Sequence, residues 1–213
     1  METKETDMPI VVLDAMGVIY QACDDVAELL IPFLREKGCA APDSAICDCY
    51  TECSLGVFES AVFWRRLGIE GEAKGLDQSY LGRHSLNSGL EEFCERMRKR
   101  SVALACISND VSEWSRHLRR RFALEHRFIN WTISGDIHCR KPDLAIFEHF
   151  IRTTNCSPGH CLYVDDRHKN LDAARRVGFH TLEFRANGSS ELEAGRRVAR
   201  NFREVEECAL TLI

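Results

Sequence analysis

The stretch VVLDAMGVIY, residues 11 to 20, decides the interpretation of this sequence. A short apolar run, typical of a strand buried on both faces, ends in a single acid, Asp14, and Gly17 then favours a turn. In open α/β sheets, ligands bind beyond the carboxyl ends of the strands, which is where Asp14 is expected. Met16 follows two residues later, and its side chain neither donates nor accepts a proton. The stretch therefore predicts a site at a strand end and leaves the purpose of Met16 to be explained.

Composition and charge narrow the class of protein. The chain has 213 residues, 45% of them apolar and 29% charged, which is enough for one full domain plus a small inserted one. The net charge of −5 argues against a nucleic-acid-binding surface and against a polybasic membrane patch. No apolar run approaches the roughly 18 residues that span a bilayer. The acidic, polar start METKETDMPI is not typical of a secretory signal, so we expect a cytoplasmic protein.

The 11 cysteines are mostly scattered singly, with one cluster at Cys47, Cys49 and Cys53. In a chain without a secretory signal, cysteines of this kind are expected to be reduced and to act as small core residues. The cluster lacks the paired Cys or Cys/His spacing of a zinc site, so we predict no zinc there. The sequence predicts no oligomeric state.

Short apolar runs that alternate with helical patterns predict an α/β fold. The later runs recur at intervals of roughly 20 to 30 residues, with helical patterns between them, which indicates a parallel sheet covered by helices on both faces. The predicted strands are residues 9–14, 101–107, 128–133, 161–165 and 179–184. The predicted helices of this core lie within residues 89–100, 111–124, 142–154 and 171–178.

The interval between the first two predicted strands is too long for a single crossover. It contains about 85 residues, whereas one crossover needs a dozen or more. Helical patterns occur in it at residues 23–38, 44–56, 60–69 and 74–84, and no alternating strand pattern does. We interpret residues 20–86 as an inserted helical cap and residues 1–19 with 87–213 as the α/β core. The expected hinges lie just after Ile19 and around Ser85–Gly89.

Side chains suited to charge chemistry follow every predicted strand except the last. In chain order they are Asp14, the run Ser108-Asn109-Asp110, Lys141, and the pair Asp165-Asp166. Each has a structural alternative, because strand-end acids often cap helices and Ser-Asn-Asp is typical of turns. Four such groups in order at consecutive strand ends are much harder to explain in that way, so we expect them to form one site.

These four segments together resemble the motifs of the haloacid dehalogenase (HAD) superfamily of aspartate-nucleophile hydrolases. The similar segments are DAMGV, CISND, RKPD and VDDRHKNLDAARRVGF. The resemblance covers nearly the whole chain, lies in the phosphatase-like branch, and includes a helical insert where that family carries a small cap. It implies an α/β fold, with a Rossmann-like parallel-sheet core and an inserted α-helical cap subdomain. It does not identify the substrate.

The resemblance implies an aspartate nucleophile and a magnesium ion. Asp14 would attack phosphorus and form a phosphoaspartate, which divides one difficult step into two. Mg²⁺ would offset the repulsion between a carboxylate and a phosphate, held by hard oxygen ligands. The implied ligands are the carboxylates of Asp14, Asp165 and Asp166 and the backbone carbonyl of Met16, which is available whatever the side chain.

The remaining motif residues would bind a small phosphorylated substrate. Ser108 and Asn109 would hold phosphoryl oxygens, and Lys141 would place a positive charge beside the nucleophile and the developing transition state. Gly17 would let the backbone turn close to the phosphate. In the cap, Arg65 is a candidate contact for an anionic group of the substrate, with a solvated surface position as the alternative.

Met16 departs from the family pattern, since phosphatases of the family carry a second Asp two residues after the nucleophile. That Asp protonates the leaving alcohol and then activates water, and its loss typically costs a factor of ~10²–10⁴ in rate. A phosphohydrolase that uses another donor (His84, His168 or water), or that acts on acyl phosphates, fits this sequence. So does a carbon–phosphorus or carbon–halogen hydrolase, although the former needs a cap lysine (Lys37 or Lys74). A non-catalytic ligand-binding module and a tailoring enzyme with an unusual substrate also remain.

Several neighbours of the motifs have open roles. Asn170 and Asp172 follow the fourth motif, and we interpret both as helix-surface residues, with support of the metal ligands as the alternative for Asn170. Arg140 and Arg167 flank the motifs, where substrate contact and solvated or capping roles are both open. Phe63 and Trp64 are adjacent, so at least one of the two is expected to be plain core.

Overall fold

The computed structural model describes residues 8–186 and 197–213. Six parallel strands form one sheet in the order β3-β2-β1-β4-β5-β6. The strands are β1 Ile10–Leu13, β2 Ala103–Ser108, β3 Asn130–Ile133, β4 Cys161–Asp165, β5 His180–Phe184 and β6 Val198–Ala199. The parallel α/β fold predicted from the sequence is confirmed. In the described ranges, no helix is long and apolar enough to cross a membrane.

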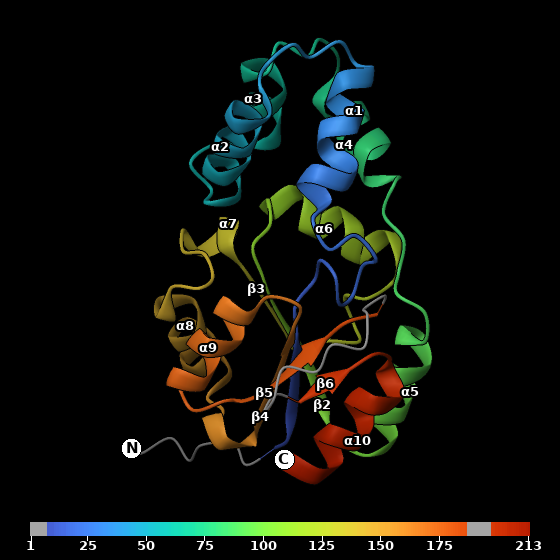
Figure 1. Ribbon diagram of the computed structural model, residues 1–213, viewed down its shortest axis with the longest axis vertical. Helices are drawn as coiled ribbons and strands as arrows, with labels where there is room; N and C mark the ends of the chain where they lie inside the picture. Colours follow the sequence, from blue (N-terminus) through green and yellow to red (C-terminus); the bar gives the residue numbers. More distant parts are fainter. Residues whose placement is uncertain (1–7, 187–196) are drawn as a thin grey trace.

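The described part of the chain contains ten α-helices, one π-helical segment and one 3₁₀-helical segment besides the sheet (Figure 1). The first five helical segments are η1 Val26–Leu30, α1 Ile31–Glu36, α2 Asp43–Ser54, α3 Ser60–Arg66 and α4 Ala73–Leu81. The others are α5 Leu90–Lys99, α6 Ser112–Arg121, α7 Ser134–Ile137, α8 Leu144–Thr154, η2 Pro158–His160, α9 His168–Arg176 and α10 Phe202–Leu212. Strand β6 and helices α7 and α10 were not predicted.

Strand β1 lies inside the sheet because its side chains are apolar in both directions. Val11 and Leu13 belong to the hydrophobic cluster that includes residues of α5 and α10. Ile10 and Val12 belong to the second cluster, with residues of α8 and α9. Figure 1 shows these two helix pairs on opposite sides of the sheet. A continuous apolar run covered on both faces is what a parallel α/β sheet requires.

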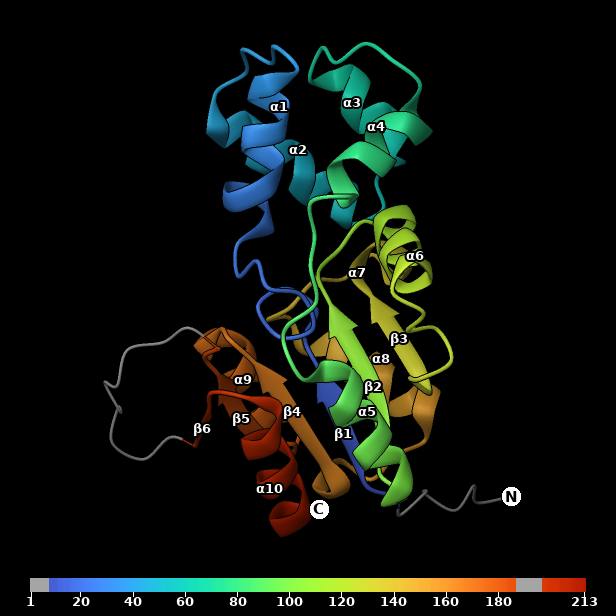
Figure 2. The ribbon, with the colours of Figure 1, turned by 90° about the vertical axis from the view of Figure 1, so that its right-hand side faces the viewer.

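Helices α1 to α4 lie together beyond the carboxyl ends of the strands (Figures 1 and 2). We call residues 20–86 the cap segment. Its aromatic core includes both Phe63 and Trp64, which are fully buried, and Tyr80. Trp114 of α6 joins them from the sheet domain, with its ring centroid 4.9 Å from that of Tyr80 and 5.3 Å from that of Phe63. The cap segment therefore packs directly on α6.

Two polar anchors hold the cap segment in this position. Asp77 of α4 accepts hydrogen bonds from the indole N–H groups of Trp64 (2.8 Å) and Trp114 (2.6 Å), so one carboxylate joins both parts. At the connections, Asn87 donates from its side-chain amide to the carbonyls of Gly17, Val18 and Tyr20. The two chain crossings that were predicted as hinges thus lie side by side and are bonded to each other.

Candidate active site

The central strands bring the predicted motif residues to one edge of the sheet. Asp14 directly follows β1, Ser108 ends β2 and Asp165 ends β4, and β1 pairs with both other strands. The Asp14 amide continues the ladder by donating to the Val164 carbonyl at 2.9 Å. Because the three strands are parallel and adjacent, their carboxyl ends coincide.

Lys141 lies between two carboxylates of this edge. Its Nζ is 2.6 Å from Asp14 Oδ1 and 3.1 Å from Asp165 Oδ2, and it also donates to the Ile107 carbonyl at 2.9 Å. The residue is only 4% exposed. Burial opposes its charged form, but the attraction of Asp14 and Asp165 outweighs burial and raises the Lys141 pKa. The site therefore contains a buried ammonium ion in contact with the predicted nucleophile.

Asp165 is the most fully bonded acid of the site. It accepts hydrogen bonds from Tyr163 Oη, from the Arg167 backbone amide at 2.7 Å, and from Asn170 Nδ2 at 3.2 and 3.0 Å. Burial opposes ionisation, but Lys141 and these donors overcome it and lower the Asp165 pKa. The interpretation of Asn170 as a helix-surface residue was wrong, because its side chain is buried and turned inward to Asp165.

A metal ion fits the acids at this edge. Asp14, Asp165 and Asp166 offer carboxylate oxygens that lie within 4.8 Å of one another. Burial, and then the Asp165 carboxylate, raise the Asp14 pKa above its usual range, and the same two causes raise that of Asp166 to about 6. Asp166 Oδ1 is buried and accepts no hydrogen bond from the described residues. The Arg167 Nε atom lies 4.0 Å from this oxygen. Clustered carboxylate oxygens are the hard donor set that Mg²⁺ prefers.

Gly17 makes room for this cluster. Its φ of 77° lies in the left-handed region, which favours glycine. A Cβ atom at this position would lie 2.6 Å from Asp166 Oδ2, too close for a real contact. Glycine is therefore needed here beside a predicted metal ligand.

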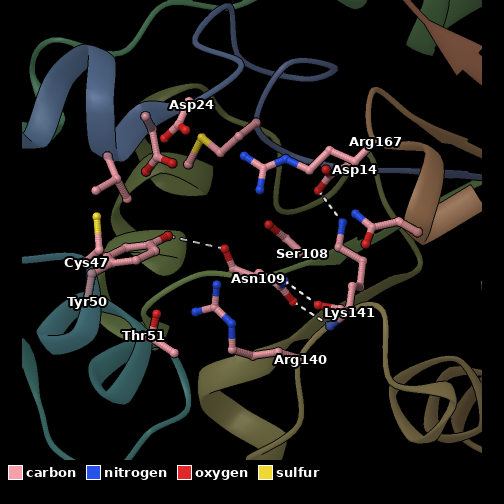
Figure 3. Close-up of a pocket in the computed structure, with 14 residues that line it drawn as sticks. Asp14, Asp24, Cys47, Tyr50, Thr51, Ser108, Asn109, Arg140, Lys141 and Arg167 are labelled. Atoms are coloured by element: carbon pink, nitrogen blue, oxygen red, sulfur yellow. Dashed lines mark hydrogen bonds and ion pairs between the residues drawn. The ribbon is translucent and has the colours of Figure 1, made fainter. Parts of the chain in front are cut away.

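These residues open into a pocket of about 190 Å³ between the sheet edge and the cap segment (Figure 3). Its lining includes Asp14, Met16, Ser108, Asn109 and Lys141, which the sequence had singled out, with Arg140, Arg167 and Asn170, whose roles were open. The cap segment contributes six further residues that were not predicted: Asp24, Asp25, Val26, Cys47, Tyr50 and Thr51.

Ser108 and Asn109 occupy different roles in the pocket. Ser108 Oγ is buried and has no hydrogen-bond partner in the described part of the chain, so it is available to a ligand. The Asn109 amide bonds at both ends to the Lys141 backbone, accepting at 2.8 Å and donating at 3.0 Å. Its side chain thus fixes the loop that carries Lys141, a role that the sequence did not predict.

The two arginines enter the pocket with different partners. Arg167 Nη2 donates to the Cys23 carbonyl at 3.2 Å. Arg140 lies over the ring of Tyr50, 5.7 Å from its centroid, and its buried Nη1 has no hydrogen-bond partner among the described residues. In the view of Figure 3, Tyr50 lies at the left of the pocket and Arg140 at the bottom, with Asp24 at the top and Arg167 and Asp14 at the upper right. An unpaired buried N–H of a guanidinium favours an anionic ligand.

Three other candidates do not reach this pocket. Arg65 is exposed on α3 and is not part of the pocket lining, so its prediction as a substrate contact is not supported. His84 is 2% exposed and packs against the rings of Tyr20 and Tyr80. His168 Nε2 lies 2.9 Å from Glu183. Neither histidine lines the pocket, so the structure does not support either as the proton donor in place of an acid at Met16.

Comparison with known sequences agrees with this geometry. A family model described as haloacid dehalogenase-like hydrolase matches residues 8–178. A phosphoserine phosphatase from Thermus thermophilus is 27% identical over 135 residues, which are 60% of this chain and 54% of that protein. The match thus spans about half the length of this relative.

Solved structures show the same fold at low identity. An HAD phosphatase from Thermococcus onnurineus has a TM-score of 0.74 at 17% identity, with 94% of this chain and 97% of that one covered. An HAD family enzyme from Bacteroides thetaiotaomicron, solved in complex with magnesium and inorganic phosphate, has a TM-score of 0.70 at 15% identity, with 86% and 98% covered. At these identities the likeness concerns the fold alone.

Proposed function

We propose that this chain, which belongs to the haloacid dehalogenase-like hydrolase family, is a magnesium-dependent phosphohydrolase of small phosphorylated metabolites. The observation that carries the proposal is the Lys141 ammonium group, which touches both Asp14 and Asp165 at the floor of the pocket. A buried cation beside a strand-end carboxylate reduces the repulsion between that carboxylate and an anionic substrate.

Asp14 is the proposed nucleophile. One of its oxygens bonds to phosphorus as the bond from phosphorus to the leaving oxygen breaks, and water later displaces the phosphate from Asp14. Lys141 opposes the rise that burial and Asp165 cause in the Asp14 pKa, and it stabilises the negative charge that gathers around phosphorus. Ser108 Oγ donates to a phosphoryl oxygen, which gives its buried hydroxyl the partner that the described residues do not provide.

Magnesium would be held by the carboxylates of Asp14, Asp165 and Asp166 and by the Met16 backbone carbonyl. When bound, it would neutralise part of the repulsion between the nucleophile and the phosphate. The Bacteroides enzyme that was solved with magnesium and inorganic phosphate supports this assignment by analogy. Asn170 and Tyr163 then act by orienting Asp165.

The alternatives have less support. A carbon–phosphorus hydrolase needs a cap lysine in the pocket, and neither Lys37 nor Lys74 lines it. A carbon–halogen hydrolase does not need the Asp165-Asp166 pair, which lies here beside the nucleophile. A non-catalytic ligand-binding module would not need Lys141 pressed against Asp14.

The test is intact-protein mass spectrometry after incubation with Mg²⁺ and a panel of acetyl phosphate, p-nitrophenyl phosphate and phosphoserine, with released phosphate followed in parallel. We expect phosphate release that EDTA stops and Asp14→Asn abolishes. Asp48→Asn, which changes an exposed acid of α2 outside the pocket, is the matched control and should behave as wild type. Neither a phosphoryl adduct nor phosphate release in the wild type, across the panel, would refute the proposal.

A further inference from the structure

We propose that Asp25, at the base of the cap segment, is the general acid and base that serves the reaction in place of an acid at Met16. This inference rests on the proposed phosphohydrolase function and assigns its proton-transfer residue. It is drawn from the position of a buried carboxyl group in the pocket that also contains Asp14 and Met16.

Asp25 is buried and yet lines the pocket. The residue directly precedes η1 and is 5% exposed. Tyr80 Oη of α4 donates a hydrogen bond to its Oδ2 at 3.2 Å, which limits the rotation of the carboxyl group. An acid that is buried, held by a neighbour and part of the pocket lining is a candidate for proton transfer to a ligand in that pocket.

The other acid of the cap segment in this pocket has a structural role. Asp24 is exposed, and its Oδ1 caps η1 by accepting from the Ala27 amide at 3.1 Å. Among the described residues that line the pocket, Asp24 and Asp25 are the only carboxylates besides the nucleophile. Tyr50, which also faces the pocket, donates its hydroxyl to the Asn109 carbonyl at 3.3 Å. Asp25 is therefore the buried carboxyl group that the cap segment contributes to the described pocket lining, and Tyr80 holds it in place.

The surroundings of Asp25 bring the pH at which it exchanges its proton closer to neutral. Burial raises its pKa to about 6, and the hydrogen bond from Tyr80 opposes the rise. A catalytic acid works best when its pKa is close to the working pH, whereas an exposed Asp would already be ionised. The charged and titratable groups around it are Asp24, Tyr50, Tyr80, Asp110 and Arg167.

In this proposal Asp25 donates the proton of the first step and accepts the proton of the second. In the first step an Asp14 oxygen bonds to phosphorus, the bond to the leaving oxygen breaks, and Asp25 gives its proton to that oxygen, which departs as an alcohol. In the second step the Asp25 carboxylate takes a proton from water, whose oxygen bonds to phosphorus as the bond to Asp14 breaks. Phosphate leaves, and both carboxyl groups return to their starting forms.

Asp25→Asn tests the proposal, because the amide oxygen can still accept from Tyr80 but the group can no longer exchange a proton. We expect turnover of phosphoserine to fall by roughly 10²–10⁴-fold, the usual contribution of general acid–base catalysis. With acetyl phosphate, whose leaving group needs no proton, we expect the first step to survive and the phosphoaspartate to accumulate in the mass spectrum. Asp48→Asn again serves as the control.

Tyr80→Phe supplies a second measurement that does not remove the acid. Because the lost hydrogen bond favours the carboxylate, the pKa of Asp25 should rise, and the alkaline limb of kcat against pH should move to higher pH. An unmoved limb, or wild-type turnover in Asp25→Asn without an adduct, overturns the role of Asp25 and leaves the phosphohydrolase proposal standing. No adduct and no phosphate release in the wild type overturns both.

Discussion

His84 provides a quantitative test of the packing inside the cap segment, where it lies against Tyr20 and Tyr80. The residue is almost fully buried, with the rings of Tyr20 and Tyr80 against it and Arg121 bonded to its backbone carbonyl. Burial, and to a lesser degree the charge of Arg121, lower its pKa from 6.5 to about 4. We predict that His84→Phe, which keeps a flat ring but cannot bind a proton, removes the loss of folding stability that this lowered pKa causes at acid pH.

The sign follows from the linkage of protonation to folding. Between a pH of about 6.5 and about 4, His84 is protonated in the unfolded chain but neutral in the folded chain, because its pKa is lower in the folded state. Protonation therefore favours the unfolded chain, and the wild type loses stability as the pH falls through this range. At about 1.4 kcal/mol per pKa unit, the loss reaches roughly 3 kcal/mol at the acid end. The stability of His84→Phe relative to wild type should therefore increase by that amount between neutral pH and about pH 4.

The assay is urea unfolding of both proteins across this pH range, with EDTA present so that metal binding does not contribute. His126→Phe, which changes an exposed histidine, is the control and should follow the pH dependence of the wild type. A stability difference between His84→Phe and wild type that stays constant with pH would show that His84 is accessible to protons in the folded state. It would then return as a candidate proton donor.

Two further predictions concern the pocket. Arg140→Gln should raise KM for phosphates that carry a second anionic group, such as phosphoserine, by about 10-fold or more with a smaller change in kcat, because the buried Nη1 of Arg140 has no hydrogen-bond partner among the described residues. Steady-state kinetics that compare phosphoserine with ethanolamine phosphate measure this effect, with the exposed Arg116→Gln as control. Equal effects on both substrates would contradict the prediction. Met16→Asp, added to Asp25→Asn, should raise the turnover of phosphoserine at least 10-fold above that of Asp25→Asn alone, since it returns a carboxyl group to the pocket. An unchanged rate would show that position 16 does not face the leaving group.

The sheet edge could be predicted from the sequence because its geometry follows from local signals. Apolar runs of strand length locate the strands, and parallel strands end at one edge, so the residues after β1, β2 and β4 must meet. This reasoning brought Asp14, Ser108 and Asp165 together correctly. Lys141 was also predicted at this edge. The structure shows that the Asn109 side chain bonds to the backbone of Lys141, and no sequence pattern indicated this contact.

The cap side of the pocket could not be predicted in this way. The face that a helix turns toward a pocket depends on how the whole segment docks, and here docking is set by Trp114 and Asp77, far apart in sequence. Asp25 lies in an acidic run before a helix, which is typical of capping, and only Asp24 has that role. The position of Arg65 could not be predicted for the same reason, since α3 turns Phe63 and Trp64 into the cap core and leaves Arg65 on its exposed side.

Asp25 also changes which part of the molecule carries the proton. An acid at position 16 would belong to the loop after β1 and would stay beside Asp14 whatever the cap segment did. Asp25 instead precedes η1 and is bonded to α4, so its place in the pocket with Asp14 follows from the packing of the cap segment on α6. Proton transfer in both steps then depends on cap docking. Under this proposal, Met16 leaves position 16 apolar, and efficient hydrolysis of the phosphoaspartate requires the cap segment to be in place.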